Sequence, residues 1–292
     1  MIMTNYDYII AEVRLRSDYD IASLIKGFKP FEVEADDTTP AATIHIDTGA
    51  APTIDGEEIS TSYLAEANAD SRFVRTAAGY AYEIVRRDGG APTALFRIDL
   101  STNHIECYLE LKDMVDVAVL RFGLWVMYGI VIAPLRGIAI HSSVIVCHDR
   151  CALFLGESGT GKSTHTRLWR ENIEGARLLN DDSPIIRVVD GRIHAYGSPW
   201  SGKTPCYINR DFPIAGFVRL SQAPHNKIKR QNALVAIGAL LPSCPHIFAE
   251  DYKLQDELCT TLGEVIAKVP VYALECLPNA EAAQLSHSTI FA

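Results

Sequence analysis

The feature that most constrains the fold is a glycine-rich run, Gly156–Ser163, which reads Gly-Glu-Ser-Gly-Thr-Gly-Lys-Ser. It fits the pattern of a glycine, four residues, then Gly-Lys-Ser/Thr, in which glycines let successive backbone N–H groups turn inward around phosphate oxygens. An apolar stretch at 152–155 precedes the run and a helical pattern follows to about Arg170, adding the positive end of a helix. The run therefore predicts a strand–loop–helix unit that holds phosphate groups.

Each position of this loop has an expected task with ATP and Mg²⁺ as ligands. The Lys162 ammonium is expected to reach the β and γ phosphates, and the Ser163 hydroxyl to ligate Mg²⁺. The alternative is a glycine-rich turn with an exposed lysine, which the flanking strand and helix disfavour. The residues expected to contact the nucleotide are Gly156, Glu157, Ser158, Gly159, Thr160, Gly161, Lys162, Ser163 and Thr164.

Two adjacent carboxylates, Asp181 and Asp182, follow an apolar strand expected at 177–180. Strand ends present residues to the ligand crevice in doubly wound and related sheets. One carboxylate is expected to hold Mg²⁺, directly or through water, and the other to accept the proton of an attacking hydroxyl. Neighbouring residues of a strand point to opposite faces, so the two acids have separate tasks. Asp-Asp before Ser-Pro is also a turn signal, which is the alternative without a function.

The chain divides into two parts that differ in their expected secondary structure. Residues 1–112 carry consecutive runs of β-branched and aromatic residues, which predict a β-rich N-terminal domain with a mainly antiparallel sheet. Residues 113–292 open with an apolar helix at 113–133 and continue as mixed strands and helices around the loop, which predicts a P-loop domain. The fold class is therefore mixed α/β. The expected strands of the first part are 6–14, 42–48, 72–76, 80–87, 93–100 and 105–111, with a hairpin turn at Asp88-Gly89-Gly90.

Several classes of partner are disfavoured. The formal charge of −9 argues against nucleic acid, which clustered lysine and arginine would bind. The helix at 114–133 is long enough to cross a bilayer, but Asp116 and Arg121 are costly at membrane depth, so a buried helix ending at Pro134 is predicted instead. Seven scattered cysteines and an N-terminus without a signal peptide favour a reducing cytoplasm.

The tightest cluster of metal-ligand residues is Cys147-His148-Asp149-Arg150-Cys151. No second cysteine or histidine pair stands at a spacing that would complete four ligands. A turn between two strands is therefore the preferred interpretation of this run.

The loop, a histidine on the preceding strand (His141) and the downstream Asp-Asp pair together resemble the catalytic domain of the HPr kinase/phosphorylase family, which phosphorylates a serine of a carrier protein. The loop alone also looks like that of ATP-dependent phosphoenolpyruvate carboxykinases, which share the nucleotide-binding fold. The resemblance covers residues 141–189 best. It implies that Asp182 is the general base, that His141 assists it, and that Asp181 has a metal-proximal or orienting role.

The sequence departs from that family in several places. Thr164-His165 stands where the family carries an acidic residue, and the family's downstream glutamate and glycine-rich signature are not found. In their place is the segment Tyr196–Lys203, which either lines the site or forms an ordinary Pro-Gly loop. The N-terminal strands do not match the family's usual N-terminal domain. The basic residues Arg219, Lys227, Lys229 and Arg230 either clamp phosphate or an acidic substrate or belong to the solvated start of a helix, and none of them is assigned a role.

The sequence thus predicts an ATP-dependent kinase that uses Lys162, Asp182 and His141 and transfers the γ-phosphate to a hydroxyl acceptor. The acceptor is a serine of a protein or peptide, or a small hydroxylated metabolite, and self-association into a homo-oligomer stays open. Two alternatives remain. One is a carboxykinase-type lyase, and the other is a non-catalytic sensor that binds ATP.

Overall fold

The computed structural model describes residues 5–64, 68–87, 94–202 and 204–292. The expected hairpin turn at 88–90 and Lys203 lie outside these residues. The chain forms two compact units, one of Met1–Pro134 with Glu250–Tyr252 and the other of Leu135–Ala249 with Lys253–Ala292. The division falls after Pro134, not after residue 112 as expected, because the long helix between these points packs on the sheet of the first unit.

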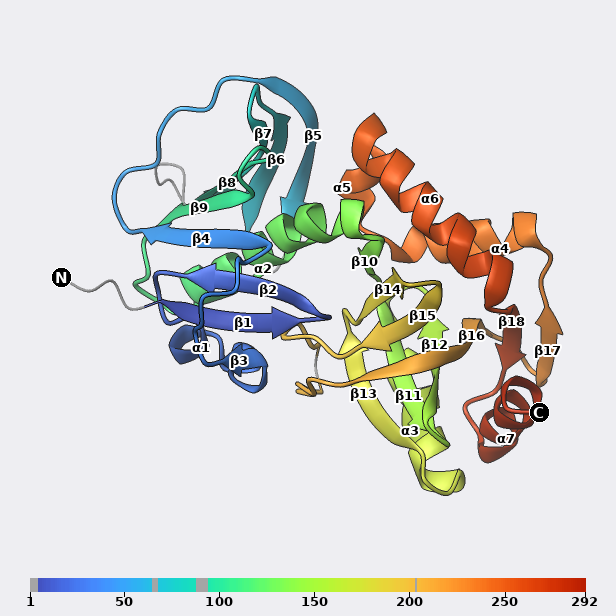
Figure 1. The fold of residues 1–292 in the computed structure, drawn as a ribbon. Coiled ribbons are helices and arrows are strands. Elements are labelled where there is room, and N and C mark those ends of the chain that lie inside the picture. Colours follow the sequence, from blue (N-terminus) through green and yellow to red (C-terminus); the bar gives the residue numbers. More distant parts are fainter. Residues whose placement is uncertain (1–4, 65–67, 88–93, 203) are drawn as a thin grey trace. The chain divides into compact units, whose positions relative to one another are not determined.

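The first unit is built on a nine-stranded sheet, counted over the described residues, in the order β3-β1-β2-β4-β9-β8-β7-β6-β5 (Figure 1). The pairings β2–β4 and β4–β9 are parallel, so the sheet is mixed and the expectation of an antiparallel sheet holds only for the rest. The strands are β1 (Tyr6–Ile10), β2 (Val13–Ser17), β3 (Glu32–Val33), β4 (Ala42–Asp47), β5 (Glu57–Leu64), β6 (Ala69–Arg75), β7 (Gly79–Arg86), β8 (Ala94–Asp99) and β9 (His104–Leu109), with the short helices α1 (Ile21–Leu24) and η1 (Lys26–Phe31) after β2.

Helix α2 (Met114–Ile132) begins with a capping box, in which Asp113 accepts from the first turn and Asp116 accepts from the backbone N–H of Asp113. Its residues contact β7, β8 and β9. At Gly123 the approach is so close that an added Cβ would lie 2.2 Å from the Phe96 ring. By length and composition alone the span Met114–Leu135 could cross a membrane, but 67% of its most apolar stretch is buried within the fold.

The segment Glu250–Tyr252 returns to the first unit late in the chain. Asp251 is fully buried there and accepts hydrogen bonds from Arg75 Nε at 3.0 Å and from the Tyr80 hydroxyl at 2.9 Å. The Arg75 guanidinium lies 4.7 Å from the centre of the Tyr252 ring. A buried carboxylate with a charged and a neutral donor has its charge and lone pairs satisfied, so this segment is part of the structure of the unit.

The second unit contains the other large mixed sheet, in the order β10-β14-β15-β16-β12-β11-β13, with β18 beside β16 and β17 beside β18 (Figure 1). The strands are β10 (Gly137–Ala139), β11 (Ser142–Cys147), β12 (Arg150–Leu155), β13 (Arg177–Asp182), β14 (Ile185–Val189), β15 (Arg192–Tyr196), β16 (Asp211–Gln222), β17 (Lys227–Arg230) and β18 (Val271–Cys276). The helices are α3 (Lys162–Asn172), α4 (Ala233–Leu240), α5 (His246–Ala249), α6 (Tyr252–Lys268) and α7 (Ala280–Ile290), with the 3-10 turns η3 (Ala133–Leu135) and η4 (Leu241–Ser243).

The central strands β11 and β12 are buried on both faces, as their continuous apolar sequence predicts. Alternate residues enter two separate cores: Val144 and Leu153 join one, and Ile145 and Phe154 the other. His141 was expected on a strand, but the structure divides residues 137–147 into β10 and β11, and His141 lies in the break between them.

Strand directions bring the functional candidates to one edge of this sheet. β11 runs antiparallel to both β12 and β13, so β12 and β13 point the same way. The carboxyl ends of β12 and β13 and the start of β11 therefore meet at the same edge. These three points carry the glycine-rich loop, the two aspartates and His141.

Candidate functional site

The glycine-rich loop joins β12 to α3, which confirms the predicted strand–loop–helix unit. Gly156, Gly159 and Gly161 have φ values of 152°, 84° and 103°, in the region that favours glycine. A Cβ added at Gly159 or Gly161 would meet no atom within 4 Å, so the loop faces open space there. Gly156 is packed, because an added Cβ would lie 2.4 Å from the Thr160 hydroxyl.

Helix α3 starts without a side-chain cap. Its N-cap position is Gly161 in a left-handed conformation, and no side chain accepts from the first turn. By contrast, Asp113, Asn232 and Asn279 cap α2, α4 and α7 with side-chain oxygens. The start of α3 thus presents backbone N–H groups and the positive end of the helix dipole, a combination that suits an anionic ligand.

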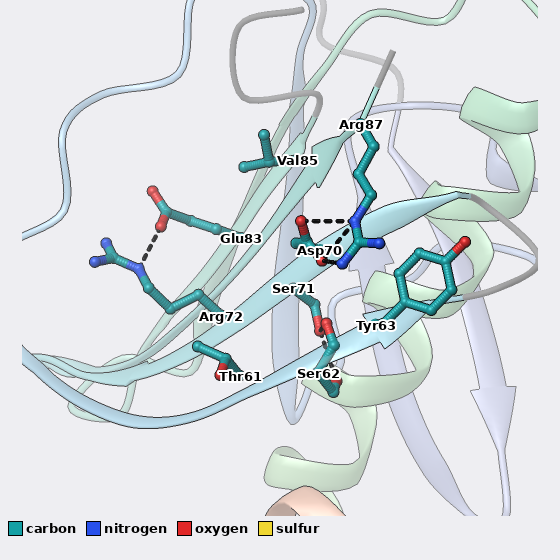
Figure 2. A pocket seen from close by; sticks show the side chains of 9 residues that line it. All are labelled: Thr61, Ser62, Tyr63, Asp70, Ser71, Arg72, Glu83, Val85 and Arg87. Carbon is teal, nitrogen blue, oxygen red and sulfur yellow. Dashed lines mark hydrogen bonds and ion pairs between the residues drawn. The ribbon is translucent and has the colours of Figure 1, made fainter. Parts of the chain in front are cut away.

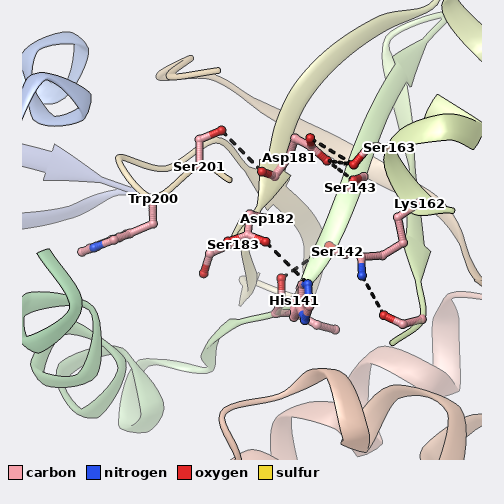
Figure 3. A network of polar contacts seen from close by, with 12 residues as sticks. His141, Ser142, Ser143, Lys162, Ser163, Asp181, Asp182, Ser183, Trp200 and Ser201 are labelled. Carbon is pink, nitrogen blue, oxygen red and sulfur yellow. Dashed lines mark hydrogen bonds and ion pairs between the residues drawn. The ribbon is translucent and has the colours of Figure 1, made fainter. Parts of the chain in front are cut away.

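Lys162 folds back over the loop. Its ammonium donates to the backbone carbonyl of Gly156 at 2.7 Å and to that of Glu157 at 3.3 Å. Burial lowers the pKa of Lys162, while the carboxylates of Asp182 and Asp181 oppose this change. The loop carbonyls therefore hold the ammonium in place, close enough to Asp181 and Asp182 for both carboxylates to stabilise its charge (Figure 3).

Asp181 is the centre of a small hydroxyl cluster (Figure 3). Its buried carboxylate accepts from Ser163 Oγ at 3.2 Å to one oxygen and 3.3 Å to the other. The Ser143 hydroxyl, on β11, also donates to Asp181. Ser163 and Asp181, which were predicted as metal ligands from separate motifs, are thus in contact. The cluster offers oxygen donors, which are the ligands that Mg²⁺ prefers.

Asp182 points the other way from Asp181, toward His141. The His141 Nε2 atom lies 3.5 Å from Asp182 Oδ1, and both side chains are about half exposed. Partial burial lowers the pKa of His141 and the Lys162 ammonium adds to this effect, while Asp182 and Asp181 oppose it. The expected separation of tasks between the two acids agrees with these different surroundings.

The remaining loop residues serve the loop itself or face solvent. The Thr160 hydroxyl donates to the Glu157 carbonyl at 2.8 Å, which closes the turn. Glu157 and Ser158 are exposed, and Thr164 lies half-buried in the first turn of α3. His165, next in the chain, is buried and does not face the acids, because its Nε2 atom meets the Ser286 hydroxyl at 3.0 Å.

The segment after β15 lies against the acids. Ser201 pairs with Asp182 in an isolated β-bridge, and the Gly202 N–H donates to the carbonyl of Asp181. Asn180 is buried and fixes this arrangement, since its amide donates to the Trp200 carbonyl at 3.1 Å and its oxygen accepts from the backbone of Asp182 at 2.8 Å. Ser201 and Gly202 therefore lie against the two acids, while Lys203, the charged residue of this segment, lies outside the described residues.

Arg219 is a member of the site that the sequence did not single out. It pairs with Leu155 across β16 and β12, directly before the loop. Its guanidinium lies 4.0 Å from the Glu157 carboxylate and donates to the Ala239 carbonyl at 3.1 Å. It also lowers the pKa of Lys162. The available signal was a basic residue at the end of an apolar strand, but only strand pairing places it beside the loop.

A separate hollow of about 600 Å³ lies on β5, β6 and β7 in the first unit (Figure 2). Its charged residues pair with one another: Arg72 Nε donates to Glu83 at 2.7 Å, and Arg87 to Asp70 at 2.6 Å. The Arg87 guanidinium also covers the Tyr63 ring at 4.2 Å. Among the described residues that line this hollow, none is a residue predicted for phosphate transfer.

No protein-family model matches this chain, and no curated protein is similar to it in sequence. Among solved structures, the HPr(Ser) kinase/phosphatase from Coxiella burnetii is similar to it at 10% identity and a TM-score of 0.30. That match covers 52% of this chain and 92% of the other. The chain is therefore a mixed α/β protein with two large mixed sheets and a distant structural resemblance, over about half its length, to an HPr(Ser) kinase/phosphatase.

Proposed function

We propose that this chain is an ATP-dependent kinase of the HPr-kinase-like group that transfers the γ-phosphate to a hydroxyl acceptor. The observation that carries the proposal is the meeting of three separate sequence motifs at one edge of the second sheet. The residues brought together are Lys162, Ser163, Asp181, Asp182 and His141.

The residues fit ATP and Mg²⁺. The open space before Gly159 and Gly161 and the uncapped start of α3 suit the phosphate tail. Ser163 and Asp181 supply oxygen donors for the metal ion. When bound, Mg²⁺ neutralises charge on the β and γ phosphates.

In the proposed reaction Lys162 leaves the loop carbonyls and donates to the transferring phosphate, where its charge stabilises the transition state. Asp182 accepts the proton of the attacking hydroxyl, and His141 holds Asp182 in place at 3.5 Å. Partial burial and the Lys162 ammonium lower the pKa of His141, which favours the neutral form of the ring beside Asp182.

The acceptor is proposed to be a serine of a protein or peptide, with a small hydroxylated metabolite as the second choice. The half-exposed Asp182 supports an external acceptor, because the group that takes the proton must be reachable from solvent. The cluster of serines beside it, Ser143 and Ser201, is buried and hydrogen-bonded within the site.

The test measures ATP binding and phosphoryl transfer separately. Wild-type protein and Asp182→Asn are incubated with labelled ATP, Mg²⁺ and a panel of serine peptides and hydroxylated metabolites, and ATP binding is measured by calorimetry. Transfer that is lost in Asp182→Asn while binding is retained supports the kinase. Binding without turnover in the wild type would identify a sensor instead, and ATP-dependent decarboxylation of oxaloacetate would identify a lyase.

A further inference from the structure

A second group of ligand-type side chains lies in the second unit, at the end of β11 and β12 away from the glycine-rich loop. The strands are joined there by a two-residue turn, His148-Asp149, which confirms the turn expected for this run. The structure adds a residue from far along the chain. Cys147 Sγ lies 3.8 Å from Nε2 of His287, which belongs to α7.

The three side chains Cys147, His148 and His287 form a metal-ligand set. One ligand atom from each lies within 4.8 Å of the other two. The ring centres of His148 and His287 are 6.1 Å apart. On a tetrahedral zinc ion, with Zn–S near 2.3 Å and Zn–N near 2.0–2.1 Å, ligand atoms are separated by roughly 3.5 Å. Small side-chain rotations would therefore bring all three atoms onto one ion.

Two of the ligands are held in place by their surroundings. Cys147 is fully buried. The His287 ring stacks on Phe291 with centroids 5.4 Å apart and meets the edge of Trp169 at 5.3 Å, which limits its rotation. Such packing around a ligand orients it before the metal arrives.

His148 is the exposed member of the set and lies in the tight turn between β11 and β12. Its φ is 49° and that of Asp149 is 58°, in the left-handed region that asparagine, aspartate and histidine enter more readily than most residues. Because the His148 side chain is exposed, a fourth ligand on its side of the set can be water.

We propose that Cys147, His148 and His287 bind one Zn²⁺, with water as the fourth ligand. Thiolate and imidazole ligands are those that zinc prefers over Mg²⁺ or Ca²⁺. Binding replaces the S–H bond of Cys147 with a Zn–S bond and releases the proton to solvent. Cys151, the other cysteine of the sequence run, does not belong to this set of three neighbouring ligand atoms, and its sulfur contacts the Phe212 carbonyl at 3.5 Å. The ion would fasten α7 to the β11–β12 turn.

The experiment uses untagged full-length protein freed of metal with a chelator. Zn²⁺ is titrated against a chromophoric chelator, and Co²⁺ is added as a spectroscopic probe, whose sulfur-to-metal charge-transfer band reports thiolate ligation. We expect one Zn²⁺ per chain, a charge-transfer band with Co²⁺, and slower hydrogen exchange in α7 when zinc is bound. The oxygen ligands Ser163 and Asp181 cannot give that band.

Variants assign the site. His148→Asn suits the left-handed turn and keeps the fold, and it should weaken zinc binding by more than the roughly 10–100-fold that loss of an outer partner costs. His287→Gln should do the same, and Cys147→Ser should abolish the band. Cys259→Ser and His225→Gln, which change an exposed thiol and an exposed histidine elsewhere, should leave binding unchanged. No band in the wild type, or a band that persists in Cys147→Ser, would overturn the proposal.

Discussion

Lys162 is the residue on which the proposed chemistry depends most directly. Replacing it with alanine should abolish phosphoryl transfer and weaken Mg²⁺–ATP binding, because the transferring phosphate would lose the ammonium proposed to stabilise its charge in the transition state. The fold should survive, since the ammonium donates only to two loop carbonyls. Transfer of labelled phosphate and calorimetry measure the two effects.

Lys268→Ala is the matched control, because that ammonium also donates to a backbone carbonyl, that of Gly191 at 2.9 Å, but outside the loop. It should keep full transfer activity. Equal rates of phosphate transfer in Lys162→Ala and the wild type would contradict the proposed kinase function.

His165 makes the stability of the second unit depend on pH. Burial lowers the pKa of His165 from 6.5 to about 4, and its Nε2 accepts from the Trp169 indole at 3.2 Å, which requires a neutral ring. The unfolded chain binds a proton near pH 6.5 that the folded state excludes. The contribution of His165 to the free energy of unfolding is therefore complete above pH 6.5. It is lost as the pH falls from 6.5 toward 4, by about 3 kcal/mol in total.

Hydrogen exchange of the α3 amides between pH 4 and 7, corrected for intrinsic rates, measures this effect. His165→Gln keeps an acceptor for Trp169 but does not titrate, so its stability should vary much less over the same range. The same slope in both proteins would show that another group carries the pH dependence.

The sequence was sufficient to identify the residues of the candidate site that belong to a local pattern. The loop, Asp181 and Asp182 follow from motif and strand end, and the structure brings them together. Arg219, one of four basic candidates, could not be chosen in this way, and His287 was not considered. Arg219 reaches the loop only through the pairing of β16 with β12, and His287 reaches Cys147 across 140 positions of the chain.

At the scale of elements, the loop depends on backbone conformations that only glycine adopts easily. Gly161→Ala places a side chain at φ 103°, and should destabilise the loop by roughly 1–2 kcal/mol and weaken ATP binding. Gly175→Ala is the control, because Gly175 has φ 74° and no atom within 4 Å of an added Cβ, yet lies in the turn after α3. Calorimetry should show weaker binding in the first variant alone. An equal loss in both would point to a general effect on the fold.

Two strands of the first sheet were predicted incorrectly or not at all, and each error has a physical reason. The strand expected at 6–14 is two strands joined by Ala11 and Glu12, both with positive φ and neither a residue typical of such a turn. Strand β5 was not predicted, because its sequence, Glu-Glu-Ile-Ser-Thr-Ser-Tyr-Leu, is mostly polar, as suits the edge of a sheet. Tertiary pairing, rather than local preference, stabilises both.

At the scale of the whole molecule, the first unit depends on a residue from the second half of the chain. Asp251→Asn would remove the fully buried counter-charge of Arg75 and leave that guanidinium, among the described residues, only the exposed carboxylate of Glu57, and it should destabilise the first unit by about 3–5 kcal/mol. Hydrogen exchange in β6 and β7 reports the loss. Asp70→Asn removes the exposed partner of Arg87 and should leave the stability nearly unchanged, because water and salt screen an exposed ion pair. Similar effects of the two substitutions would contradict a structural role for the returning segment.

The placement of Asp251 bears on how the protein is made. During translation Arg75 is synthesised long before Asp251, which lies 176 positions later in the chain. Until then the nascent N-terminal sheet carries a guanidinium and a tyrosine hydroxyl, that of Tyr80, without their final acceptor. The first unit is therefore complete only once residue 251 has been synthesised, and truncation before residue 251 should yield an N-terminal unit prone to proteolysis and aggregation.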